Sequence, residues 1–271
     1  MKRMILSGIL ALAAGAAGLM AQTPPAAAPK QGAAPKGPAP KSKAELEAIQ
    51  AMFAASQAGN NDGVIKAAED LIAKFADTDF KETAFFMEAD AYQQKRDYTK
   101  AQIYAEQALQ VNPRSFQASI MLAEVVTSGT RENDLDREEK LGKAEKYAKD
   151  AMDFVKDAPK PNPQLSDAQW EDFKKSIAGR AHNAMGLGAL TRKKYDVAAA
   201  EFKTAVENDP QPAFIVREAS ALQSGGKNDE AIALCDKIIN DPQAHPQIKS
   251  VAQQIRGAAV KAGGKGPGGA Q

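Results

Sequence analysis

The residues best suited to chemistry are few and stand far apart in the chain. There are two histidines, His182 and His245, and one cysteine, Cys235. Nucleophilic catalysis and transition-metal binding both need several such side chains to converge, and no His/Cys or His/Asp pair here has the spacing of a known site. The sequence therefore predicts a protein that is not an enzyme and that holds no metal and no cofactor.

One short segment of the chain is dense in acidic residues. Five carboxylates occur close together, at Glu132, Asp134, Asp136, Glu138 and Glu139. A calcium-binding loop also needs a glycine for its sharp turn and a closing glutamate at a fixed distance, and the segment has neither. We expect a solvated acidic loop that leads into a helix N-terminus, where the helix dipole favours carboxylates.

Phosphate-binding chemistry is not indicated. The segment Gly225-Gly226-Lys227 joins two helical stretches and lacks the spacing of a phosphate-binding loop. Eight of the 35 basic residues lie near the two ends of the chain, which leaves 27 basic against 34 acidic residues between them. Because that balance offers no basic stripe for a phosphate backbone, nucleic acid is not an expected partner.

The N-terminal segment is typical of an exported protein. Two basic residues precede an apolar run from Met4 to Met20, which ends at the small residue Ala21. This pattern predicts a signal peptide over residues 1–21 and a periplasmic or secreted protein. The alternative is an uncleaved inner-membrane anchor, although a span needs roughly 20 apolar residues and glycines dilute this run.

Two further segments have a composition that disfavours regular structure. Residues 22–43 are rich in Pro, Ala and Lys, and the prolines are spaced so that no helix can continue. Residues 263–271 are rich in Gly. The sequence predicts a disordered linker and a disordered tail on either side of a folded domain over residues 44–262.

Within this domain the apolar residues recur at helical spacing, and the breaks fall at short polar, Gly or Pro stretches. Aromatic residues make up only 6% of the chain, so closely packed, alanine-rich helices are expected instead of a sheet-based core. Cys235 fits this pattern together with Ala231 and Ile238, and we interpret it as a core residue because a single cysteine cannot form an internal disulfide.

One phrase occurs twice in the same register. The phrase consists of a tyrosine, two alanines and a proline, and the spacings between them are the same in both copies. The first copy is Tyr98, Ala101, Ala108 and Pro113, and the second is Tyr195, Ala198, Ala205 and Pro210. The phrase resembles the tetratricopeptide repeat, a helix–turn–helix unit of about 34 residues. The resemblance implies an all-α fold, a right-handed α-solenoid of about five helix pairs, with residues from Pro246 to Lys261 as a C-terminal capping helix.

The repeats depart from the family pattern in two places. The third unit carries an insertion around Ser128 to Glu139. A capping box at Ser166 and Gln169 opens a helix that continues to about Arg192, nearly twice the usual length. Its early turns carry Trp170 and Phe173, which either pack on the preceding pair or offer an aromatic contact.

The resemblance also implies where a partner binds. In this family the first helix of each pair contributes to a concave inner face, and a mixture of apolar and amide side chains there suits an extended peptide or a partner helix. The matching positions are Ile49, Phe53, Phe86, Asp90, Gln93, Ile120, Glu124, Asn183, Leu187, Val216 and Gln223. Members that grip a C-terminal carboxylate use Lys, Asn and Arg on this face, and only Arg180 and Asn183 remain of such a clamp.

These features predict a non-catalytic adaptor that holds a protein or peptide partner in the bacterial cell envelope. One alternative is an accessory factor anchored in the inner membrane by its N-terminal segment, which would then be the chain's membrane contact. Another is a solute-binding protein or an enzyme that uses the long helix and the insertion as a lid.

Overall fold

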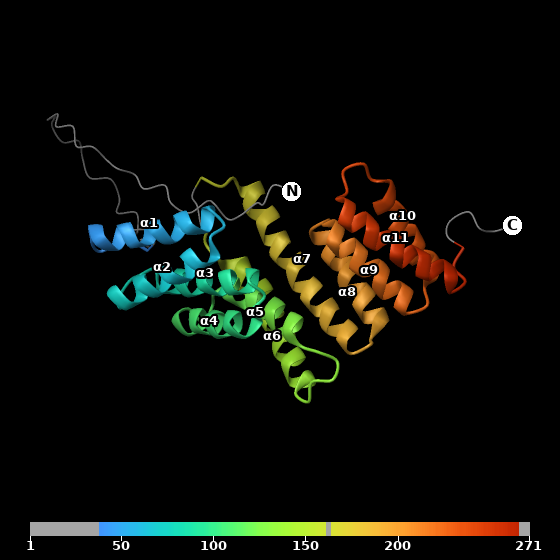
Figure 1. The fold of residues 1–271 in the computed structure, drawn as a ribbon, viewed down its shortest axis with the longest axis horizontal. Helices are drawn as coiled ribbons and strands as arrows, with labels where there is room; N and C mark the ends of the chain where they lie inside the picture. Colours follow the sequence, from blue (N-terminus) through green and yellow to red (C-terminus); the bar gives the residue numbers. More distant parts are fainter. Residues whose placement is uncertain (1–37, 161–163, 266–271) are drawn as a thin grey trace, which may run out of the picture.

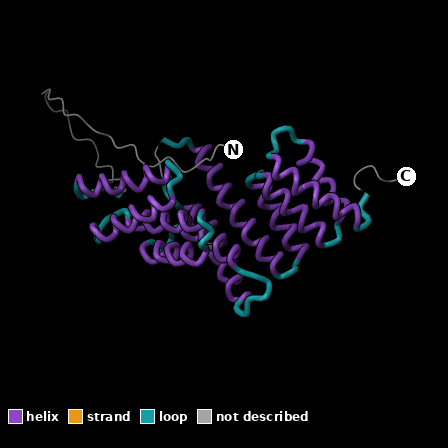
Figure 2. The backbone as a smooth tube through the Cα atoms, in the orientation of Figure 1, coloured by secondary structure: helices purple, strands orange, loops and turns teal. Residues whose placement is uncertain are grey.

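A computed structural model describes residues 38–160 and 164–265, and in these two ranges every regular element is an α-helix (Figure 2). The predicted signal peptide, residues 22–37 of the predicted linker and residues 266–271 of the predicted tail lie outside the described residues.

The helices form five consecutive antiparallel pairs and one additional helix (Figure 1). The pairs are α1 (Lys43–Gln57) with α2 (Asn61–Lys74), α3 (Lys81–Gln94) with α4 (Tyr98–Val111), α5 (Phe116–Gly129) with α6 (Arg137–Asp157), α7 (Asp167–Thr191) with α8 (Tyr195–Asn208), and α9 (Pro212–Ser224) with α10 (Asn228–Asn240). The last helix, α11 (Pro246–Lys261), packs on α9 and α10. The predicted all-α repeat solenoid with a capping helix is confirmed.

Side-chain caps set several of the helix starts. Asn60 accepts a hydrogen bond from the Gly63 amide at 2.9 Å, and Ser115 accepts one from the Ala118 amide at 3.2 Å. At the start of α7 the Ser166 hydroxyl accepts from the Gln169 amide, while the Gln169 side chain accepts from the Ser166 amide. This capping box was predicted, and it satisfies two amides that an unprotected helix end would leave unpaired.

The turn within a pair has the same geometry in four of the five pairs. Each contains one residue with a positive φ: Gly59, Arg96, Lys193 and Gly226. The amide of the following residue donates back to a carbonyl in the last turn of the first helix, as in Asp97 to Tyr92 and Lys194 to Ala189, both at 2.9 Å. This Schellman-type closure brings the second helix back along the first. The third pair, which contains the insertion, does not use this turn.

Alanines lie where the helices cross. Ala101, Ala105 and Ala108 in α4 and Ala198 and Ala205 in α8 are all fully buried. Small side chains at these positions let neighbouring helices approach closely, which explains the repeated phrase in the sequence.

The helix α7 is the longest and serves two parts of the core. Its first half packs on α5 and α6, where Trp170 and Ile177 join Ile120 in one apolar cluster. Its second half packs on α8, where Ala189 joins a different cluster with Phe202. Of the two alternatives for the aromatic residues of α7, the structure shows packing: Trp170 is 6% exposed, and its ring stacks on Phe173 at 5.3 Å.

The C-terminal end is closed by α11. Ala252 of this helix is fully buried in a cluster that also contains Cys235 and Ile238, so the predicted core position of the cysteine is confirmed. Among the residues that the structure describes, no helix combines the length and the apolar character that a membrane span requires.

Candidate partner-binding face

We use the term inner face for the surface formed by the first helices of the five pairs, α1, α3, α5, α7 and α9. Among these helices, α3 packs directly on α5, and α5 packs on α7. This layer carries all eleven predicted binding residues.

The structure divides those eleven residues into two groups. Seven are partly exposed and can contact a partner: Phe53, Phe86, Asp90, Gln93, Glu124, Leu187 and Gln223. Four are buried: Ile49, Ile120, Asn183 and Val216. Ile49 is 0% exposed and Ile120 is 1% exposed, so their side chains contribute to the core and not to an accessible face.

The burial of Ile120 has a clear cause. The overhanging first half of α7 lies on α5 and covers this residue with Trp170, Ile177 and Ala181. Val216 is covered in the same way at the other end of the array, where α11 follows the last pair. The part of the inner face that a partner can reach is therefore smaller at α5 than it would be in a regular repeat.

A bidentate ion pair joins α5 to α7 in the middle of the inner face. Arg180 Nε and Nη2 donate to the two carboxylate oxygens of Glu124, each at 2.7 Å. Burial alone would lower the pKa of Arg180, but the charge and the hydrogen bonds of Glu124 outweigh it and hold that pKa above its ordinary value. The charges of Asp90 and Asp209 act in the same direction.

A second polar contact joins α7 to α9. Arg217 Nη1 donates to Asn183 Oδ1 at 2.5 Å. Burial lowers the pKa of Arg217, and the nearby charge of Glu124 opposes this effect. Glu124, Arg180, Asn183 and Arg217 thus form a row across three first helices, which we call the polar ladder.

The polar ladder decides what the predicted clamp residues can do. Both Arg180 and Asn183 are already engaged, the first by a carboxylate of this chain and the second by Arg217. Charge-assisted bidentate pairs are among the strongest hydrogen-bonded contacts in proteins, so a partner's carboxylate would have to displace Glu124. The two residues act as internal bridges in this structure.

Arg217 was not recognised from the sequence, although its spacing offered a signal. On α9 it lies three residues before Ser220, which lies three residues before Gln223, one of the predicted residues. Residues three apart are neighbours on a helix surface, so Ser220 connects Arg217 to Gln223 and could have placed Arg217 at the edge of the inner face.

The carboxylates of the acidic insertion are paired with bases of the chain. Lys140 contacts Asp134 at 3.3 Å and Asp136 at 2.9 Å, and Lys193 contacts Glu132 at 2.5 Å. Arg192 Nε donates to Glu138 at 2.7 Å, which ties the insertion to the turn after α7. Within residues 38–160 and 164–265, no three His, Cys, Asp or Glu side chains gather in a way that could hold a metal ion.

The histidines and the cysteine have separate structural settings. His182 Nδ1 lies 2.8 Å from Glu201 between α7 and α8, whereas His245 Nδ1 accepts a hydrogen bond from the Gln247 amide at 3.3 Å at the start of α11. Burial raises the pKa of Cys235 to about 11, so its thiol stays protonated at neutral pH. The structure does not bring these three side chains together.

Comparison with known proteins supports the tetratricopeptide repeat family for this chain. The family model described as tetratricopeptide repeat matches residues 86–151 and 183–246, which correspond to the second and third pairs and to the fourth and fifth pairs. No curated protein sequence matches the chain. Proteins built from these repeats generally serve as scaffolds for protein–protein interaction and are typically non-catalytic.

One solved structure supports the fold. A thermophilic tetratricopeptide repeat protein of Thermus thermophilus aligns with a TM-score of 0.50 and 19% identity, over 80% of this chain and 99% of that chain. A repeat protein from Parabacteroides merdae aligns with a TM-score of 0.42 and 14% identity, over 82% and 91%. The TPR2AB domain of yeast Sti1, solved in a complex with pHSP90, aligns with a TM-score of 0.31 and 14% identity, over 81% of this chain and 98% of that chain.

Proposed function

We propose that this protein is a non-catalytic adaptor that binds an extended segment or a helix of another protein on its inner face. The observation that carries the proposal is the composition of that face. The polar ladder runs across α5, α7 and α9. Partly exposed apolar and amide side chains on α1, α3, α7 and α9 lie on either side of it. Such a surface offers apolar contacts and hydrogen bonds along a line, which suits a segment that has little structure of its own.

The polar ladder supports this proposal by fixing the spacing of the helices. Preorganised surfaces bind more tightly because less conformational freedom is lost on association. Glu124 and Arg180 hold α5 to α7, and Asn183 and Arg217 hold α7 to α9. The face is thereby held in one arrangement before a partner arrives.

We further propose that the adaptor works in the cell envelope, after export through the N-terminal signal segment. The support is the sequence pattern of two basic residues, an apolar run from Met4 to Met20 and a small residue at Ala21. Mass spectrometry of the protein from its native cells tests this point. A mature chain that begins at Gln22 supports export with cleavage, and an intact N-terminus in the membrane fraction supports the anchored alternative.

The binding face is tested by two surface variants matched in chemistry. The first, Gln93→Arg with Gln223→Arg, places charge on α3 and α9 of the inner face. The control, Gln110→Arg with Gln254→Arg, makes the same change on α4 and α11 at exposed positions away from that face. Both variants replace polar side chains, so the fold should be retained, and circular dichroism checks this.

Quantitative mass spectrometry of proteins co-purified from envelope extract is the readout, followed by calorimetric titration of the candidate partner with all three forms. A partner bound by the wild type and the control but at least about tenfold more weakly by the inner-face variant supports the proposal. Equal affinity for all three forms would place the binding site elsewhere on the molecule.

A further inference from the structure

The buried side of α3 contains a carboxyl group that the fold does not neutralise. Glu88 is 1% exposed, and within the described residues neither of its carboxylate oxygens has a hydrogen-bond partner. Burying an ionised carboxylate without partners is among the most unfavourable arrangements in a protein interior. Such a group stays neutral, or its surroundings change when it ionises.

The groups around Glu88 come from the two helices α2 and α4. From α2, the charge of Glu69 disfavours ionisation; from α4, the Tyr104 hydroxyl and the charge of Lys100 favour it. The hydroxyl of Tyr104 lies near the carboxyl group, although no hydrogen bond of ordinary geometry joins the two. The charged neighbours therefore leave burial as the dominant influence on this group.

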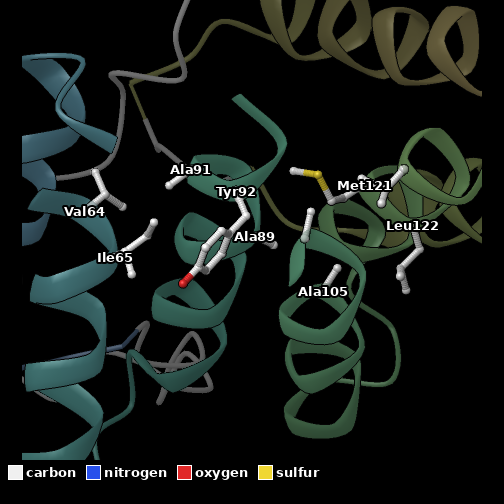
Figure 3. Close-up of a cluster of buried hydrophobic side chains, with 10 residues drawn as sticks. Val64, Ile65, Ala89, Ala91, Tyr92, Ala105, Met121 and Leu122 are labelled. Carbon is white, nitrogen blue, oxygen red and sulfur yellow. The ribbon is translucent and has the colours of Figure 1, made fainter. Parts of the chain in front are cut away.

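The same junction holds a large part of the core. Val64 and Ile65 of α2, Tyr92 of α3 and Ala105 of α4 belong to one apolar cluster (Figure 3), and Tyr104 packs against it. The rings of Tyr92 and Tyr104 stack at 5.4 Å with an interplanar angle of 5°. Tyr104 packs against this cluster and its hydroxyl lies near the carboxyl group of Glu88, so its ring connects the carboxyl group to the contact between α3 and α4.

We propose that Glu88 is a proton-controlled packing switch at the junction of α2, α3 and α4. The neutral carboxyl group lets α3 pack closely against α4, and ionisation loosens this junction because the carboxylate must gain water or a cation. Phe86, Asp90 and Gln93 lie on the same helix and on the inner face, so the switch acts on the face as well as on the core.

The direction of the pH dependence follows from the shift. Burial raises the pKa of Glu88 from its ordinary value of 4.5 to about 7. Burial also raises the pKa of Tyr104, to about 12, and the charge of Glu88 acts in the same direction. Below pH 4.5 the group is neutral in both the folded and the unfolded chain. Between pH 4.5 and 7 the unfolded chain loses the proton first, so stability falls as pH rises, and above pH 7 the loss is complete.

The experiment combines a direct titration with a local stability measurement on the full chain. Carbon-13 NMR of labelled glutamate carboxyl groups gives the midpoint for Glu88, which we expect near neutral pH. Hydrogen exchange at pH 5 and pH 8, corrected for intrinsic rates, gives the opening equilibrium of α3 and α4. We expect the opening constant of the wild type to be on the order of 100-fold larger at pH 8 than at pH 5, and that of Glu88→Gln to be nearly the same at both pH values.

Three further variants make the test specific. Glu69→Gln should lower the midpoint of Glu88 and Tyr104→Phe should raise it, since the first removes a repulsive charge and the second removes a group that favours ionisation. Glu47→Gln changes an exposed carboxylate of α1 and should leave the pH dependence as in the wild type. A Glu88 midpoint near 4.5, or an equal pH dependence in Glu88→Gln, would overturn the proposal.

Discussion

Gly186 of α7 lies directly against the ring of Phe202 in α8: a Cβ atom at position 186 would stand 2.7 Å from Cε1 and 2.8 Å from Cδ1 of that ring. Phe202 is fully buried, so its ring is enclosed by other side chains of the core. The glycine is the reason that the two helices of the fourth pair can approach this closely.

We therefore expect Gly186→Ala to destabilise the protein by about 1–3 kcal/mol through overpacking, despite the better helix propensity of alanine. Chemical denaturation measures the effect. Gly188→Ala is the matched control, because it lies in the same helix and its added Cβ would meet its nearest neighbour, Leu141, at 3.7 Å. The control should be neutral or stabilising by up to about 1 kcal/mol; equal losses in both variants would contradict this packing.

Ala198→Leu tests the register of the repeats. Ala198 is fully buried in α8 at the helix crossing, so a larger side chain should cost about 1–3 kcal/mol and lower the melting temperature. Ala200→Leu in the same helix is exposed and should change the melting temperature little. If the two variants melted alike, the assigned crossing would be wrong.

Arg96→Gly tests the turn geometry between α3 and α4. Arg96 has a φ of 62°, a conformation that glycine adopts without the steric cost that other residues bear. We expect Arg96→Gly to be about 0.5–1 kcal/mol more stable than Arg96→Ala, since both lose the side chain and only glycine relieves the strain. Urea denaturation of the two variants provides the comparison, and a more stable alanine variant would contradict the turn.

The ion pair between Glu124 and Arg180 is expected to contribute a coupling energy of about 1–2 kcal/mol, between the values of exposed and buried pairs because both side chains keep some contact with water. A double-mutant cycle with Glu124→Ala and Arg180→Ala measures it. The exposed pair of Lys66 and Asp70, at 3.1 Å in α2, is the control cycle and should give less than about 0.5 kcal/mol. Similar values for both pairs would mean that the polar ladder does not fix the helices.

The thiol of Cys235 should react slowly with disulfide reagents in the folded protein. Its pKa is raised to about 11 by burial, against 9.0 for the ordinary thiol, so little thiolate is present at pH 8 and the sulfur is also covered. Unfolding in urea should restore ordinary reactivity. We expect the native rate to be lower by at least about tenfold, and fast labelling of the native protein would indicate that α10 and α11 separate readily.

The helical repeats were predictable because their signals are local. Alanine spacing, turn residues and the capping box at Ser166 depend on neighbours within a few residues of the chain, and they gave the number of pairs, the long helix and the capping helix. Matches to the family pattern at Ala101 and Ala198 placed the crossings correctly.

The accessible part of the inner face was harder to predict because it depends on contacts between distant residues. Nothing near Ile120 in the sequence shows that the overhang of α7 covers it. Likewise, the pairing of Glu124 with Arg180 joins residues that are 56 positions apart. Glu88 did carry a local signal, because it stands at i, i+4 spacing between the buried residues Ala84 and Tyr92, on the apolar stripe of its helix.

The length of α7 has a mechanical consequence for the third and fourth pairs. A helix of 25 residues is a rod of about 37 Å, and its two ends belong to different apolar clusters. In a regular array each unit contacts only its neighbours, and unfolding can stop at any boundary. Here one continuous helix contributes to both clusters, so a tilt imposed at Trp170 should also displace Ala189, and the third and fourth pairs should unfold together.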